Sequence, residues 1–158
     1  MKRSSTLFLR FVLCLIAVGA LVGLIWFPQT EGRATILNLI SIYTDPFIIY
    51  GYIASIPFFV ALYQAFKLLG YVDKNKIFSQ AAIKAVRNIK YCGLAISGFL
   101  VLAILYIRVM VHGDDPAGPT MLGFVAIFIS IVIATATAIF ERLLQNAVDI
   151  KSENDLTV

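Results

Sequence analysis

The chain has 158 residues, of which 60% are hydrophobic and only 14% are charged, with a mean hydropathy of +0.90 and a formal net charge of +4. A water-soluble domain usually carries about 25% charged residues, so a soluble chain of this composition could not cover its surface with polar side chains. The composition therefore excludes an ordinary soluble domain and predicts that the protein lies in a bilayer.

The first apolar segment covers residues 11–27 and contains no charge. It lies at the short end of the length needed for a membrane span, and Arg10 can lengthen it by placing its aliphatic stem along the lipid. Lys2 and Arg3 before an apolar run are also typical of a signal peptide. Because the run ends in the bulky sequence LIWFPQT, without small residues for cleavage, we expect an uncleaved span.

The second apolar segment covers residues 46–66, again without a charge. The pair Asp45-Pro46 predicts a helix start, with Asp45 as the N-cap and Pro46 at the first helical position. Aromatic residues lie near both ends of the segment, where the headgroup regions of a bilayer favour them. We therefore predict a second span that begins at Pro46.

A basic segment at residues 67–90 separates the second span from the third, which we place at residues 91–107. The segment holds six of the thirteen Lys and Arg residues and a single acid. Within it, Ser79 is a candidate helix N-cap, with Phe78 and Ile83 spaced as a hydrophobic staple. Apolar residues then recur near helical spacing, so we predict a short amphipathic helix in this loop that leads into the third span.

The fourth apolar segment covers residues 121–140 and is followed by a polar tail at residues 141–158. Apolar residues keep helical spacing just beyond the span, at Leu143, Leu144, Ala147 and Val148. We expect the last helix to continue out of the membrane as an amphipathic stalk. The four segments together predict an all-α fold, a four-helix transmembrane bundle that forms one integral membrane domain over residues 1–158.

Lys and Arg residues decide the orientation, because cytoplasmic loops carry an excess of them. If both termini and the basic segment share one side, that side holds eleven of the thirteen: Lys2, Arg3, Arg10, Lys67, Lys74, Lys76, Lys84, Arg87, Lys90, Arg142 and Lys151. The other side holds Arg33 and Arg108. Both termini and the basic segment are therefore predicted to be cytosolic. This topology accounts for the net positive charge, so we expect no direct binding of nucleic acid.

Small residues in two of the spans could let helices approach closely. Gly19 and Gly23 form a GxxxG motif in the first span, and a similar ridge in the fourth consists of Ala126, Ser130, Ala134 and Ala138. Packing within the bundle is the interpretation that we favour for both. A seam between two copies of the chain is the alternative, so a homo-oligomer stays open.

No combination of residues predicts a catalytic, cofactor-binding or metal site. The spans lack the Asp, Glu, Lys and His residues that ion-coupled transporters usually keep at membrane depth. Cys14 and Cys92 lack CxxC spacing and are expected to be packing residues. His112 with Asp114 and Asp115 is a poor metal site, and a solvated loop is the simpler explanation. We therefore expect a protein that is not an enzyme.

Two oppositely charged elements are expected at the cytosolic face. The basic segment has a local charge of +6 − 1 = +5, and the tail from Asp149 has −4 + 1 = −3, counting the chain-end carboxylate. Tethered opposite charges attract, so we expect the tail to lie against the basic segment and a partner to compete for it. The candidate interaction surface is Lys74, Lys76, Phe78, Ser79, Lys84, Arg87, Glu153, Asp155, Leu156 and Val158. Topology and attraction to anionic lipid are the simpler explanation of the basic segment.

The stretch IPFFVALYQAFKLLGYVDKNKIFSQAAIKAVRNIKYC and the ending NAVDIKSENDLTV resemble the bacterial four-pass membrane family called domain of unknown function 2975. The resemblance extends over nearly the whole chain and implies a protein of the bacterial plasma membrane. The family has no established biochemical activity. Its members are often encoded beside a short helix-turn-helix regulator, which implies, by association, a membrane partner for a transcription regulator.

These observations predict a multi-pass membrane protein that acts as a non-enzymatic sensor or regulatory partner through its basic segment and tail. A helix-turn-helix regulator is the candidate cytosolic partner. The alternative is a small transport or immunity-type membrane protein that binds an apolar molecule within the bundle, and a structural membrane subunit is a third possibility. Copurification of a regulator would favour the first function, and ligand-dependent stabilisation or flux in liposomes would favour the second.

Overall fold

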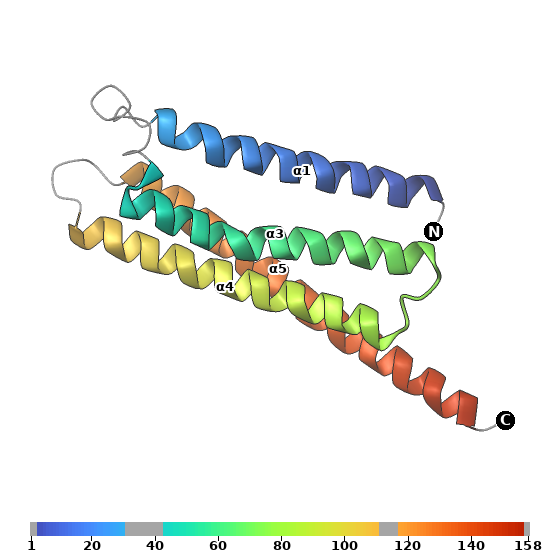
Figure 1. Ribbon diagram of the computed structural model, residues 1–158. Helices are drawn as coiled ribbons and strands as arrows, with labels where there is room; N and C mark the ends of the chain where they lie inside the picture. Colours follow the sequence, from blue (N-terminus) through green and yellow to red (C-terminus); the bar gives the residue numbers. More distant parts are fainter. Residues whose placement is uncertain (1–2, 31–42, 111–116, 157–158) are drawn as a thin grey trace.

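The part of the chain that the structure describes consists mainly of four long helices, and each contains one of the predicted spans (Figure 1). The computed structural model describes residues 3–30, 43–110 and 117–156. Within these ranges there is no strand, and the helices are α1 (Arg3–Thr30), α3 (Pro46–Asp73), α4 (Gln80–Met110) and α5 (Ala117–Leu156). Each helix is long and apolar enough to cross a membrane. The predicted all-α architecture with four spans is therefore confirmed.

Successive helices run in opposite directions, so three parts of the chain meet at one end of the molecule. These are the start of α1, the turn between α3 and α4, and the last part of α5, whose final turns extend beyond the other helices (Figure 1). We call this the basic end, after Lys74, Lys76, Lys84, Arg87 and Lys90 at the turn and in the first part of α4. Among the described residues, helices pack closely in chain order, α1 on α3, α3 on α4 and α4 on α5. α1 therefore lies at the edge of the group.

α1 contacts α3 along a single stripe. Its least exposed side chains recur at helical spacing: Thr6, Arg10, Leu13, Ala17, Ala20, Leu24 and Pro28. Its other described side chains are exposed, as suits a helix whose remaining faces are covered by lipid. Gly19 and Gly23 lie off the stripe, and a Cβ added at either would meet no atom within 4 Å. The prediction that this GxxxG motif packs closely within the bundle is therefore wrong.

A close helix approach lies instead between α4 and α5. A Cβ added at Gly93 of α4 would lie 3.2 Å from Ala134 Cβ and 3.2 Å from the Ser130 carbonyl oxygen of α5. A Cβ added at Gly123 would lie 2.8 Å from Ile104 Cδ1. Ala134 and Ser130 belong to the small-residue ridge predicted for the fourth span. These two members pack within the bundle, as expected.

The most buried apolar side chains lie at the basic end rather than in the middle of the spans. Ala82, Ile83, Ala85 and Val86 of α4 are at most 2% exposed, and Leu144 of α5 is also buried. With 31 and 40 residues, α4 and α5 are about 46 and 60 Å long, well beyond a hydrocarbon core of about 30 Å. Lipid solvates apolar side chains inside the bilayer, but outside it they must bury one another. The helices therefore form a core of the water-soluble type where they extend past the membrane.

The predicted short amphipathic helix between the second and third spans is not a separate element. Residues 80–90 form the first turns of α4, which continues without a break to Met110. No Gly or Pro occurs between residues 80 and 92 to end a helix there. The apolar residues that suggested a short helix are the packed face of the extended α4. The helical periodicity of residues 80–90 was predicted, but no boundary separates this segment from the third span.

Both predicted helix N-caps are present. Asp45 Oδ1 accepts a hydrogen bond from the Phe47 backbone N–H at 2.8 Å, and Pro46 occupies the first position of α3. Ser79 Oγ accepts one from the Ala82 N–H at 3.3 Å at the start of α4. These bonds satisfy backbone donors that a helix leaves unpaired in its first turn. The sequence therefore predicts where these two helices begin.

Candidate functional site

The turn between α3 and α4, residues 74–79, begins with a tightly bonded helix end. The Lys76 N–H donates to the Tyr71 carbonyl at 2.8 Å, and the Asn75 N–H donates to the Val72 carbonyl at 3.0 Å. This pattern is a Schellman motif, which needs a residue in the left-handed region. Asn75 supplies it with φ of 53°. Asn tolerates this conformation better than most residues other than Gly, so the turn is well defined.

The second half of the turn is anchored to α4. Ser79 Oγ donates to the Lys76 carbonyl at 2.7 Å while it caps the helix. Ile77 packs against the core, whereas Phe78 is 53% exposed although Ile83 is buried. The predicted Phe78–Ile83 staple is therefore wrong, because Ile77 occupies the inward position. The turn presents Phe78 outward, together with the exposed side chains of Lys74 and Lys76.

The core beneath this turn joins three helices. Ile83 and Val86 of α4 pack with Leu144 of α5. Partly buried side chains complete the cluster from α3, the turn and α5: Leu68, Ile77 and Val148. Among the predicted stalk residues, Leu144 and Val148 face inward as expected, but Leu143 is exposed. The surface at the turn therefore rests on a packed base.

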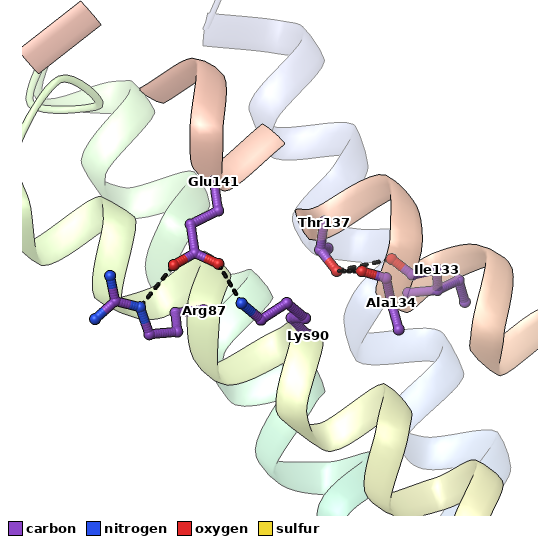
Figure 2. Close-up of polar contacts among 6 residues, drawn as sticks. All are labelled: Arg87, Lys90, Ile133, Ala134, Thr137 and Glu141. Atoms are coloured by element: carbon purple, nitrogen blue, oxygen red, sulfur yellow. Dashed lines mark hydrogen bonds and ion pairs between the residues drawn. The ribbon is translucent and has the colours of Figure 1, made fainter. Parts of the chain in front are cut away.

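Glu141 of α5 bridges two cations of α4 (Figure 2). Arg87 Nε donates to Glu141 Oε1 and Lys90 Nζ donates to Glu141 Oε2, each at 2.6 Å. The Glu141 side chain is only 12% exposed, while that of Arg87 is 50% exposed. Donation from Lys90 and then from Arg87 holds the pKa of the Glu141 carboxyl below its usual range. Arg87, predicted to serve an interaction surface, is thus engaged within the protein, whereas Lys84 is exposed.

A second ion pair joins α1 to α3 at the same end. Arg10 Nη2 lies 2.6 Å from Asp73 Oδ2, and the guanidinium carbon lies 5.3 Å from the centre of the Phe66 ring. Arg10 therefore lies beside the last turns of α3, where a carboxylate and an aromatic face both favour its charge.

The tail continues α5 as a helix. α5 extends to Leu156, and Figure 1 shows its last turns extending away from the other three helices. Residues 151–154, including Glu153, are exposed, and Asp155 lies in the last helical turn. The prediction that the tail from Asp149 lies against the basic segment is wrong for the described residues, because the continuous helix carries this part of the chain away. Val158 lies outside the described residues.

An apolar cavity of about 600 Å³ lies between α1, α3 and α4, toward the end of the molecule opposite the basic end. Its lining is mostly aromatic and small: Ala20, Gly23, Leu24, Phe27 and Pro28 from α1, Phe47, Ile48, Tyr50, Gly51, Tyr52, Ala54, Ser55, Phe58 and Phe59 from α3, and Phe99, Leu100 and Ala103 from α4. None of these described lining residues is charged. The cavity was not predicted, because it depends on how far α1 stands from α4.

The described residues bring no metal-binding group together. Within them, no three His, Cys, Asp or Glu side chains gather closely enough to hold an ion. Cys14 and Cys92 are free thiols on α1 and α4, two helices that do not pack against each other. The candidate loop of His112, Asp114 and Asp115 lies outside the described residues.

Comparison with known families agrees with this architecture. The family model described as "Protein of unknown function (DUF2975)" matches residues 28–158. The chain belongs to the DUF2975 family. The resemblance inferred from the basic segment and the ending of the sequence is therefore confirmed, and DUF2975 carries no described activity.

A relative of this DUF2975 protein is the "Uncharacterized membrane protein YoaS" of Bacillus subtilis (strain 168). The two are 44% identical over 160 residues, which cover 100% of each chain. No solved structure matches the chain. Four apolar helices, the family match and a membrane relative together establish that this DUF2975 chain is a multi-pass membrane protein.

Proposed function

We propose that this DUF2975 protein is a non-enzymatic regulatory partner of the bacterial plasma membrane, whose basic end faces the cytosol and docks a soluble protein. The observation that carries the proposal is the exposure of Phe78 in a turn that is bonded at both ends. A fixed, exposed aromatic side chain leaves apolar area in water, which a partner would cover. Aromatic residues in such positions often anchor protein interfaces.

The charges around Phe78 indicate the kind of partner. Lys74 and Lys76 are exposed beside it, and Lys84 is exposed on the first turns of α4. A surface with these features fits an acidic partner that has an apolar pocket for the ring. Because the turn rests on the packed cluster of Ile83, Val86 and Leu144, little ordering would be needed on binding.

The family resemblance supports a short helix-turn-helix transcription regulator as the docked protein. Such a regulator would be held at the membrane or released from it, according to the state of the bundle. This role requires no chemistry from the chain, in keeping with a site composed of one aromatic and several lysine side chains.

Copurification tests the proposal directly. The full chain is coexpressed with a short helix-turn-helix regulator of the kind that is often encoded beside family members, and it is purified from solubilised membranes. We expect the regulator to copurify with the native chain, and Phe78→Ala or the pair Lys74→Glu and Lys76→Glu to remove it. Phe128→Ala is the matched control, because Phe128 is also an exposed phenylalanine but lies in the fourth span. Equal recovery with Phe78→Ala and with the native chain would contradict docking at the turn.

A fluorescent variant separates protein docking from simple contact with lipid. Trp26 is the single tryptophan of the chain, so Phe78→Trp in a Trp26→Phe background carries one emitter at the turn. In liposomes we expect emission typical of water that shifts to shorter wavelength when the regulator is added. Short-wavelength emission before any addition would mean that lipid headgroups already cover this residue.

A further inference from the structure

The cavity between α1, α3 and α4 has the size of a ligand site and belongs to the membrane spans. Its volume of about 600 Å³ lies within the range of about 300–1,000 Å³ that is usual for small-molecule sites. It is open rather than enclosed, and its described lining is apolar. An apolar space of this kind stays dry, so hydrocarbon rather than water is its natural content.

The few polar side chains of the cavity are already hydrogen-bonded to the protein. Tyr50 Oη donates to the Phe99 carbonyl at 2.6 Å, and Tyr52 Oη donates to the Leu24 carbonyl at 3.0 Å. Ser55 Oγ donates to the Tyr52 carbonyl at 2.7 Å. All three hydroxyl protons are therefore used, and two of the bonds tie α3 to its neighbours. A molecule bound in the cavity therefore contacts apolar surface, and the cavity presents it with no hydroxyl donor that lacks an acceptor.

The arrangement of the helices keeps this space available. Among the described residues α1 packs on α3 but not on α4, so no contact between these two helices closes that side of the cavity. Gly23 of α1 and Gly51 of α3 line the cavity, and a Cβ added at either would meet no atom within 4 Å. Tyr50 also packs edge-on against Phe99, with ring centres 5.8 Å apart, which gives one wall a fixed shape.

The length of the cavity matches one leaflet of a bilayer. On α3 the lining residues extend from Phe47 to Phe59, which is about 18 Å along the helix axis. Half of a hydrocarbon core about 30 Å thick is close to this length. The cavity therefore has the depth of a single lipid chain that enters from the leaflet opposite the basic end.

We propose that this cavity is a binding site for one hydrocarbon chain of a membrane lipid. The surrounding bilayer is as apolar as the cavity, so binding gains nothing from leaving water and depends on packing against the fixed aromatic wall. The site selects the chain, since its described lining offers no charge to a headgroup. This inference is independent of regulator docking at the basic end.

Photocrosslinking in liposomes tests the site. The purified full chain is reconstituted with a trace of phosphatidylcholine that carries a diazirine in the middle of one saturated chain. After illumination, peptides are mapped by mass spectrometry. We expect adducts to concentrate on residues 20–28, 47–59 and 99–103, and an excess of unlabelled saturated phosphatidylcholine to reduce them several-fold.

Matched glycine variants separate the site from ordinary lipid contact. Gly51→Phe places a ring in the cavity and should reduce the adducts several-fold. Gly98→Phe is the control, because Gly98 lies in the span of α4, is exposed, has no atom within 4 Å of an added Cβ and does not line the cavity. Thermal unfolding in detergent verifies that both variants are folded, and Gly23→Phe fills the same space from α1 if Gly51→Phe is unstable.

Three results would overturn the proposal. Adducts spread evenly over exposed residues of α5, such as Val132, would show that lipid only surrounds the protein. Equal labelling of the native chain and of both cavity-filling variants would show that the cavity holds no chain. Crosslinks between two copies of α1 across Gly23 would likewise overturn it, because a second copy would then cover the cavity.

Discussion

Lys90 Nζ of α4 donates to Glu141 Oε2 of α5 at 2.6 Å, and Arg87 occupies the other oxygen of the same carboxylate. Glu141→Gln would leave two cations beside a neutral amide. We expect the free energy of unfolding in detergent to fall by about 1–2 kcal/mol. The loss is no larger because Arg87 is half exposed, and water weakens its attraction to Glu141. Asp149→Asn is the control, because Asp149 bonds only locally to Gln145 at 2.9 Å, and an equal effect there would contradict a special role for Glu141.

The same carboxylate predicts the direction of a pH effect. The pKa of Glu141 is lower in the folded protein than in the unfolded chain, because Lys90 and Arg87 donate to its ionised form. Its stabilising contribution is therefore complete above the ordinary glutamate pKa of about 4.3 and is lost as the pH falls through the lowered folded value. The stability difference between the native chain and Glu141→Gln should shrink as thermal unfolding is measured at decreasing pH. A difference that grows on acidification would contradict this linkage.

Two glycine substitutions test which helix faces pack. Gly93→Leu should destabilise the fold, because even a Cβ there lies 3.2 Å from the Ser130 carbonyl oxygen, and overpacking typically costs about 1–3 kcal/mol. Gly19→Leu should change thermal unfolding in detergent little, since an added Cβ meets open space. If Gly19→Leu lowers the stability more than Gly93→Leu does, the GxxxG face of α1 packs against a second protein chain.

Asn75 is expected to set the shape of the turn that presents Phe78. Asn75→Gly should keep or slightly raise stability, because glycine adopts positive φ without strain. Asn75→Val should lower the free energy of unfolding by about 1–2 kcal/mol, which is the penalty of the left-handed region for other residues. Denaturation in detergent micelles measures both. Equal stability of the two variants would mean that the turn relaxes to another conformation.

Much of the fold could be predicted because its determinants are local. The charge-free runs define four spans, and Asp45 and Ser79 act as the predicted caps, since capping depends on residues only a few positions apart. The left-handed conformation of Asn75 could also have been predicted. Asn75 follows the last turn of α3, and Asn is one of the residue types that tolerate positive φ.

The features that were missed depend on contacts between distant parts of the chain. Opposite charge predicted that the acidic residues from Asp149 onward would pair with the basic segment. Glu141, which is 54 and 51 residues from Arg87 and Lys90, fills that role instead. The GxxxG spacing of Gly19 and Gly23 predicts a helix face with small side chains, but it does not determine which helix packs against that face. The cavity follows from the same placement of α1, which no local pattern determines.

The claim on which the account depends is that the basic end faces the cytosol, and thiol labelling of intact cells tests it most directly. In a background with Cys14→Ser and Cys92→Ser, single cysteines are introduced as Lys74→Cys in the turn and as Asp115→Cys between the third and fourth spans. A membrane-impermeant thiol reagent should label only the cysteine at position 115, and the one at position 74 should react only after the cells are permeabilised. Labelling at position 74 and protection at position 115 in intact cells would contradict the account.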